Sequence, residues 1–219
     1  MSMATFGELG PTLLDAIDAR VSVNPRQSVT RLMYAATFAE GANDVKVSAD
    51  HSELVDELAA EAAFTGVLVM NEKAVLHLYE APCDQALSFL AKLKAKACVG
   101  ELRVLFSSED CPERVMNEWS EHRVSRPAET VDIDAEDPVD ASFELYSTLL
   151  KIYERMAKFN DADMMKSNAD FVPSAERIAA FTKSDKFMSL DEYLDFFHAP
   201  IHLELGSEKV WPIQQFMLA

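Results

Sequence analysis

The sequence lacks the features that mark secreted, membrane and disulfide-rich proteins. No apolar run approaches the roughly 20 residues that a membrane-spanning helix needs. The three cysteines, Cys83, Cys98 and Cys111, form no CxxC pair, and their odd number argues against a disulfide framework. The N-terminus has neither the basic start nor the apolar run of a signal peptide, so we expect a cytosolic or ciliary compartment.

Sequence patterns of catalytic and metal sites are also missing. No GxGxxG, P-loop, GxSxG or HExxH pattern occurs. His198 and His202 have the spacing of a metal-binding helix, but Pro200 lies between them and would break that helix. A net charge of −17 repels phosphate backbones and anionic lipid, which excludes nucleic acid and membranes as primary ligands. We therefore predict a protein that is not an enzyme and holds no metal.

The segment 64–81, FTGVLVMNEKAVLHLYEA, predicts the central hairpin of the fold. Its two arms are rich in β-branched and large apolar side chains, and Asn71, which tolerates left-handed dihedral angles, opens a polar turn. Both arms are apolar on almost every side chain, so we expect the sheet to be covered on both faces. His77 is the polar exception in the middle of a strand, where a hydrogen bond to a neighbour is a commoner role than catalysis.

The pattern around this hairpin predicts an α+β, ferredoxin-like domain of order βαββαβ. Asp50 or Ser52 is the expected cap of its first long helix, and right-handed crossovers place both long helices on the same face. The expected elements are a lead-in helix 11–21, strand 28–36, helix 48–63, the hairpin, helix 82–97, strand 101–107, a turn or short helix 112–116, and a candidate fifth strand 122–125.

A C-terminal helical region is expected after an acidic stretch, which we interpret as a solvated linker rather than a docking motif. The strongest helix, 139–160, has an apolar stripe that is the natural cover for the open face of the sheet. If exposed, the stripe would instead bind a partner. Shorter helices are expected at 173–183 and 190–198, the latter with a capping box of Ser189 and Glu192. The stripe consists of Phe143, Tyr146, Leu149, Leu150, Tyr153, Met156 and Ala157.

Several pieces in order, RLMYAA, FTGVLVMNEKAVLHLYEA and PERVMNEW, resemble the BLUF domain, a flavin-binding blue-light sensor, over residues 28–126. The resemblance implies that Tyr34 is the family's first-strand tyrosine and that Thr65-Gly66 is its TG motif. Trp119 matches a late tryptophan of many members. These positions make Tyr34, His77 and Trp119 the candidate cofactor-binding residues if flavin is retained.

Two departures from the family concern the flavin itself. His77 stands where the family has the glutamine whose amide rearranges under light, and Ala59 falls on the position of an asparagine. Histidine cannot rotate an amide, and alanine cannot hydrogen-bond a flavin ring. Each stranded polar group would cost about 1–3 kcal/mol. We therefore expect that binding of FAD, the cofactor that the resemblance implies, is weakened or lost.

A longer resemblance, to the testis-expressed protein 47 family of BLUF-like axonemal proteins, covers nearly the whole chain. The pieces VLHLYE, PERVMNEW, EYLDFF and Val210-Trp211-Pro212 carry it by their order and spacing. It implies a non-catalytic subunit of the ciliary or flagellar axoneme, structural or regulatory, associated with inner-arm dynein or its tether. The alternative is a functional FAD-binding photoreceptor that modulates dynein-driven motility, and a weaker third is a regulator of a cyclase or phosphodiesterase.

These expectations divide the chain into a lead-in 1–27, a BLUF-like domain 28–126, an acidic linker 127–138 and a C-terminal region 139–219. The candidate partner-binding residues all lie in the last of these. They are Phe143, Tyr146, Leu150, Tyr153 and Trp211.

Overall fold

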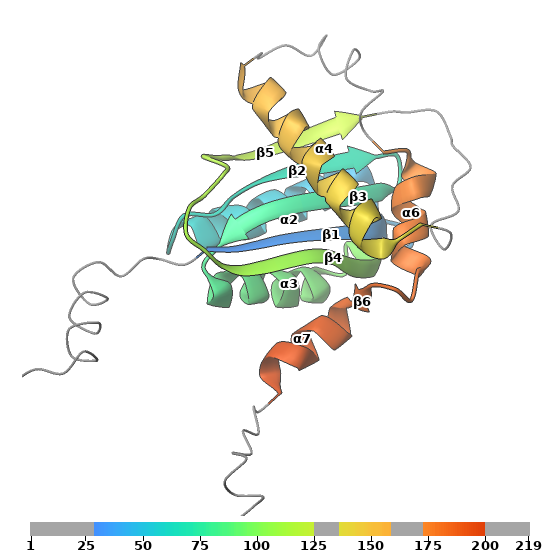
Figure 1. Cartoon of the computed structure of the whole chain (residues 1–219). Helices are drawn as coiled ribbons and strands as arrows, with labels where there is room; N and C mark the ends of the chain where they lie inside the picture. Colours follow the sequence, from blue (N-terminus) through green and yellow to red (C-terminus); the bar gives the residue numbers. More distant parts are fainter. Residues whose placement is uncertain (1–28, 125–135, 159–172, 200–219) are drawn as a thin grey trace, which may run out of the picture.

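The computed structural model describes residues 29–124, 136–158 and 173–199, and a six-stranded sheet lies at its centre (Figure 1). The strand order is β5-β2-β3-β1-β4-β6. Neighbouring strands are antiparallel except β2 and β5, which run parallel. The strands are β1 (Val29–Phe38), β2 (Thr65–Asn71), β3 (Ala74–Ala81), β4 (Val99–Cys111), β5 (Trp119–Val124) and the two-residue β6 (Met188–Ser189).

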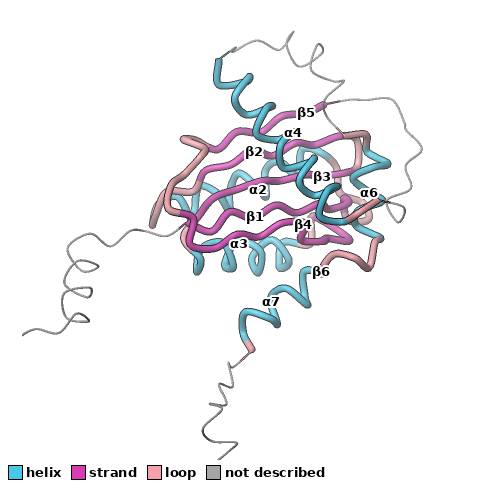
Figure 2. Tube along the Cα trace, viewed as in Figure 1, coloured by secondary structure: helices cyan, strands magenta, loops and turns pink. Residues whose placement is uncertain are grey.

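Helices cover both faces of the sheet, as Figures 1 and 2 show. Helices α2 (Asp44–Ala59) and α3 (Cys83–Lys96) pack on one face. Helices α4 (Pro138–Lys158) and α6 (Ala175–Lys183) pack on the other. Helix α7 (Leu190–His198) follows β6 and adds its apolar side to the cluster of α2 and α3. The predicted βαββαβ order, the fifth strand, the shared face of the two long helices and the C-terminal cover are therefore confirmed.

The hairpin of β2 and β3 is the most deeply buried part of the sheet, because every residue in both strands is buried. Gly66 is required in β2, since a Cβ at this position would lie 2.7 Å from the carbonyl oxygen of Leu78 on β3. The predicted turn differs in one detail. Asn71 belongs to the strand and is buried, and Glu72 takes the left-handed conformation with φ of 52°.

The start of α2 was predicted four residues late. Asn43 is the cap, and its side-chain oxygen accepts a hydrogen bond from the backbone N–H of Lys46, so the predicted caps Asp50 and Ser52 lie inside the helix. Asn, Ser and Asp compete closely as caps, and the two valines of the first turn, Val45 and Val47, alternate instead of following the helical spacing. At α7, in contrast, the predicted capping box of Ser189 and Glu192 is confirmed.

The stripe on α4 covers the sheet, but it is displaced from the predicted one. The most deeply buried members include Leu145 and Ile152, which the prediction left out, whereas Phe143 is 63% exposed. The two stripes share Leu149 and Tyr153, and a helix so rich in large side chains has several overlapping apolar stripes at 3.6 residues per turn. The predicted helix 11–21, the extended 201–205 and Trp211 lie outside the described residues.

Candidate functional site

The three predicted cofactor-binding residues lie together on the α2–α3 side of the sheet. Tyr34 on β1 and His77 on β3 are paired residues in the antiparallel ladder, and both are fully buried. Their hydroxyl oxygen and ring Nδ1 are 3.1 Å apart. Trp119, at the start of β5, donates its indole N–H to Nε2 of His77 over 3.1 Å. Strand pairing thus brings together residues that are far apart in the sequence.

A fourth residue, His51 on α2, completes the cluster and was missed in the sequence. Its Nε2 lies 2.7 Å from the hydroxyl oxygen of Tyr34, and its Nδ1 lies 2.7 Å from the carbonyl oxygen of Val47. His51 lies on the same helical face as Leu54, Val55 and Leu58, which follow it at helical spacing along α2. A histidine on an apolar stripe was the signal that could have identified it.

The partners fix the direction of every hydrogen bond in this cluster. The indole N–H of Trp119 can only donate, so Nε2 of His77 accepts, and neutral His77 carries its proton on Nδ1. That N–H donates to the hydroxyl of Tyr34, whose own proton goes to Nε2 of His51. His51 then donates from Nδ1 to the carbonyl oxygen of Val47. We call this series, from Trp119 to Val47, the polar chain.

Burial keeps the polar chain neutral. Desolvation lowers the pKa of His77 well below its ordinary value, and the neighbouring His51 lowers it further. Desolvation also lowers the pKa of His51, although its hydrogen bond to Val47 and the nearby carboxylates of Glu121 and Asp50 oppose this effect. Desolvation raises the pKa of Tyr34 well above its ordinary value. Because protonated His77 would direct an N–H against the indole N–H, charge and geometry favour the same protonation state.

Aromatic rings fill the space around the polar chain. The ring of His77 lies 5.0 Å from Tyr79 and 5.4 Å from Phe89, centroid to centroid. Phe64 lies 5.0 Å from Tyr79 and 5.2 Å from Phe89. Edge and tilted contacts of this kind are typical of a packed aromatic core.

These residues do not fit a flavin ring as they lie. The ring nitrogens of His51 and His77 and the hydroxyl proton of Tyr34 are already paired within this cluster and with Trp119 and Val47, so none of these donors and ring nitrogens is left for a cofactor. Ala59, the position of the family's asparagine, is exposed at the last residue of α2 and does not face them. The helix residue that does is His51.

A second buried group, Glu80 on β3, holds the loop that leads to Trp119. Its carboxylate pairs with Arg31 at 2.6 Å and accepts hydrogen bonds from the backbone N–H groups of Val115 and Met116. Arg114 in the same loop donates to the carbonyl oxygens of Glu80 and Ala63. The segment PERVMNEW is therefore conformationally fixed at several points before β5 begins.

The candidate partner-binding residues of α4 have different environments. Tyr153 is buried, and its hydroxyl oxygen accepts hydrogen bonds from the backbone N–H groups of Asn117 and Glu118. Tyr146 and Leu150 are half-buried, and the hydroxyl of Tyr146 accepts a hydrogen bond from Arg31. Phe143 points into solvent, and Trp211 lies outside the described residues.

Two searches of the described residues bear on other kinds of site. No three His, Cys, Asp or Glu side chains within 29–124, 136–158 and 173–199 gather in a way that could hold a metal ion. In the same residues, no helix has both the length and the apolar character that crossing a membrane requires.

Comparison with protein families identifies the relatives of this chain. The family described as testis-expressed protein 47 matches residues 28–199, which span the polar chain, the central hairpin and the covering helices. The chain belongs to this family. The first three pieces of the sequence resemblance fall inside the matched residues, while Trp211 falls beyond them.

Solved BLUF structures are similar to this member of the testis-expressed protein 47 family. The ground state of BlsA is 18% identical, with a TM-score of 0.43, over 56% of this chain and 87% of that one. The dark state of BlrB, a BLUF protein, is 19% identical, with a TM-score of 0.39, over 45% and 74%. A bacterial light-regulated adenylyl cyclase is 12% identical, with a TM-score of 0.39, and the chain spans only 40% of its length.

Proposed function

We propose that this protein is a non-catalytic subunit of the ciliary or flagellar axoneme, where its BLUF-like sheet is a rigid platform associated with inner-arm dynein or its tether. The assignment to the axoneme comes from the resemblance of the sequence to BLUF-like axonemal proteins. The observation that carries the platform role is the closed polar chain, in which buried groups satisfy one another rather than a cofactor.

The outer side of α4 is the surface that we assign to the partner. Val139 and Phe143 are 71% and 63% exposed, although the same helix buries its other side against the sheet. The ring of Phe143 lies 6.3 Å from that of Tyr146, which in turn stacks on Phe106 of β4 at 5.0 Å. Exposed aromatic side chains with a supporting half-buried layer are typical of interface anchors.

The partner surface can be tested by a substitution that leaves the core intact. Phe143→Asp should remove the protein from detergent-extracted axonemes of ciliated cells while the purified variant keeps its melting temperature, because the side chain is mostly in solvent. The matched control is Val45→Asp on α2, since Val45 is 61% exposed on the opposite side of the sheet. Retention of Phe143→Asp in the axoneme, or equal loss of both variants, would contradict the assignment.

A photoreceptor that binds FAD is the second candidate, because Tyr34 and His77 meet in the sheet at the positions that the BLUF resemblance gives to tyrosine and glutamine. An absorption spectrum of protein purified with added FAD separates the two functions. The platform predicts no protein-bound flavin band. A flavin band that shifts to longer wavelength under blue light and recovers in darkness would favour the photoreceptor and refute the platform.

A further inference from the structure

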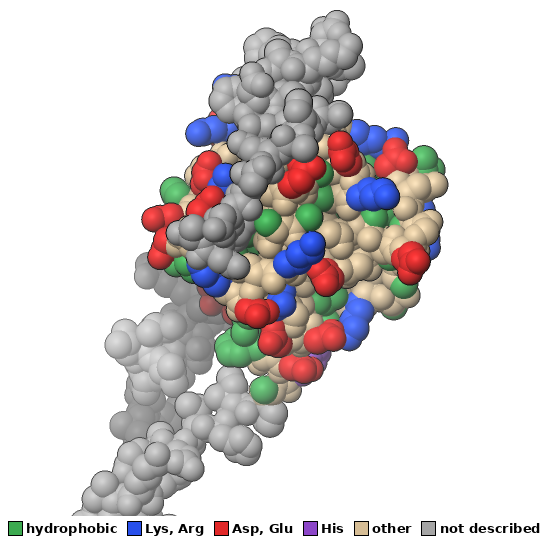
Figure 3. Space-filling view, turned by 90° about the vertical axis from the view of Figure 1, so that its right-hand side faces the viewer, with side chains coloured by type: hydrophobic (Ala, Val, Ile, Leu, Met, Phe, Trp, Pro, Cys, Tyr) green, Lys and Arg blue, Asp and Glu red, His purple; other side chains and the backbone are tan. Residues whose placement is uncertain are grey.

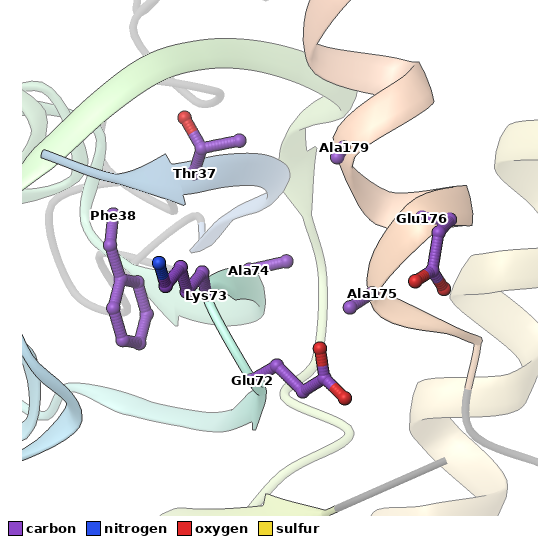
Figure 4. Close-up of a pocket in the computed structure, with 8 residues that line it drawn as sticks. All are labelled: Thr37, Phe38, Glu72, Lys73, Ala74, Ala175, Glu176 and Ala179. Atoms are coloured by element: carbon purple, nitrogen blue, oxygen red, sulfur yellow. The ribbon is translucent and has the colours of Figure 1, made fainter. Parts of the chain in front are cut away.

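A cavity lies between the turn of the central hairpin and the first turns of α6, and none of its lining residues belongs to the polar chain. Its volume is about 620 Å³, which is within the roughly 300–1,000 Å³ of ligand sites. Figure 4 shows that its walls come from the end of β1, the β2–β3 turn and α6. The lining residues are Thr37, Phe38, Glu72, Lys73, Ala74, Ala175, Glu176 and Ala179.

Two carboxylates face this cavity from different elements. Glu72 comes from the hairpin turn and Glu176 from the first turn of α6, and Figure 4 shows both on the α6 side of the cavity. In the part of the chain that the structure describes, neither side chain forms an ion pair or hydrogen bond. The space-filling view of this side shows charges of both signs interspersed (Figure 3), so the pair is a local feature rather than part of one acidic field.

The backbone conformation of Glu72 is unfavourable for a residue with a side chain. Its φ of 52° lies in the left-handed region, where glycine or asparagine is favoured, and the hairpin loop has only two residues because Asn71 pairs with Ala74. A residue that violates its local backbone preference marks a functional or a strained site. Glu176 alone could be explained by the dipole of α6, but that explanation does not extend to Glu72.

The remaining lining gives the chemistry of an occupant. Ala74, Ala175 and Ala179 form an apolar wall that suits an aliphatic side-chain stem. Lys73 directs its ammonium toward Phe38, so a cation enters most favourably on the α6 side (Figure 4). A second cavity of about 470 Å³ on the other side of the turn offers no such pair, because Asp44 there already binds Arg123 at 3.3 Å.

We propose that the cavity of the hairpin turn and α6 is a docking site for an arginine side chain in an extended segment of a partner protein. A guanidinium is planar and has five N–H groups, so it can bind two carboxylates at once, which an ammonium does less well. A partner with basic segments also complements a chain of net charge −17. This inference does not depend on the assignment of the protein to the axoneme.

The test is an NMR titration of the full chain with a capped peptide, acetyl-Ala-Leu-Arg-Leu-Ala-amide. Shifts should concentrate at the backbone amides of Glu72, Lys73, Glu176 and Ala179. The same peptide with citrulline, a neutral isostere of arginine, should bind at least about fivefold more weakly, because it can make no charge-assisted bonds. Equal affinity for the two peptides, or no shift at these amides, would overturn the proposal.

Substitutions separate a site from general electrostatic attraction, because only the charges beside the cavity should change the affinity. Glu72→Gly and Glu176→Gln should each weaken binding by about two- to fivefold, as expected for exposed charge pairs, and Lys73→Gln should strengthen it. Glu61→Gln, at an exposed glutamate after α2, is the matched control and should change nothing. Glu72→Gly should also raise the melting temperature, because glycine relieves the positive φ, which shows that the fold survives.

Other occupants would give distinct results. Equal weakening by Glu61→Gln would show general electrostatic attraction instead of a site. A dimer in light scattering that Glu72→Gly dissociates would mean that a second copy of the chain fills the cavity. Either result would overturn the proposal of a partner segment.

Discussion

Replacing Tyr34 by phenylalanine should destabilise the fold far more than the loss of one hydroxyl normally does. The hydroxyl links two buried histidines, accepting from His77 and donating to His51. Its removal strands an N–H on one ring and an unpaired nitrogen on the other, at about 1–3 kcal/mol for each group. We therefore expect Tyr34→Phe to lower the free energy of unfolding by about 2–6 kcal/mol, out of about 5–15 kcal/mol for a typical domain.

Tyr79→Phe is the matched control, because Tyr79 is equally buried but its hydroxyl donates only to the carbonyl oxygen of Ala86. That carbonyl keeps its bond within α3, so the loss should be about 1 kcal/mol. The assay is urea unfolding followed by circular dichroism, with the midpoint and slope of each variant compared. Equal losses for the two variants would refute the conclusion that the hydroxyl of Tyr34 links two buried histidines.

A triple variant sharpens the same test. Tyr34→Phe combined with His51→Leu and His77→Leu removes the donors and acceptors together, and removing both partners of a buried hydrogen bond is much less costly than removing one. Trp119 is only half-buried, so water can take its indole N–H. The triple variant should therefore be more stable than Tyr34→Phe alone, and a further loss would show that the histidines contribute chiefly by packing.

Three further predictions follow from the buried groups. Burial lowers the pKa of His51 and His77, so below about pH 6.5 the unfolded chain binds more protons than the folded chain. Stability should therefore fall as the pH drops from about 6.5 to 5.5, by at most about 1.4 kcal/mol per pH unit for each histidine. His77→Gln should make this pH dependence shallower in urea unfolding. Glu80→Ala should lower the free energy of unfolding by about 3–5 kcal/mol in the same assay, because it removes the buried carboxylate that pairs with Arg31 and accepts from two backbone N–H groups, and a loss below about 1 kcal/mol would contradict the pairing. Tyr153→Phe should speed hydrogen exchange of the two loop amides that bond its hydroxyl, and unchanged protection would show that α4 does not hold the loop.

The sequence predicted the parts of the fold that follow from periodicity. The hairpin is evident because both arms are continuously apolar, and α4 because large apolar residues recur every three and four positions. Details decided by single polar groups were not predictable in the same way. Asn43 caps α2, and Glu72 takes the left-handed turn position that Asn71 was expected to take.

Part of the candidate site could be predicted from the sequence, because some of its residues lie in segments with a clear pattern. Tyr34 and His77 could be aligned because they lie in recognisable strands, and Trp119 because it follows a distinctive segment. His51 was missed because a polar residue on an apolar helical stripe was not treated as a candidate. The role of His51 depends on where α2 crosses the sheet. The distance of 2.7 Å between its Nε2 and the hydroxyl oxygen of Tyr34 is a result of tertiary packing, which no local sequence pattern encodes.

The polar chain has one arrangement, and this property favours a platform over a switch. Its direction begins at Trp119, whose indole N–H cannot accept, and ends at the carbonyl of Val47, which cannot donate. Reversing the Tyr34–His77 bond would set two N–H donors against each other at Trp119, and reversing the Tyr34–His51 bond would set two acceptors against each other at Val47. A glutamine amide at position 77 could exchange its oxygen and nitrogen by rotating about one side-chain bond. Histidine between Trp119 and Tyr34 removes that choice, which holds β1, β3 and α2 in a single geometry.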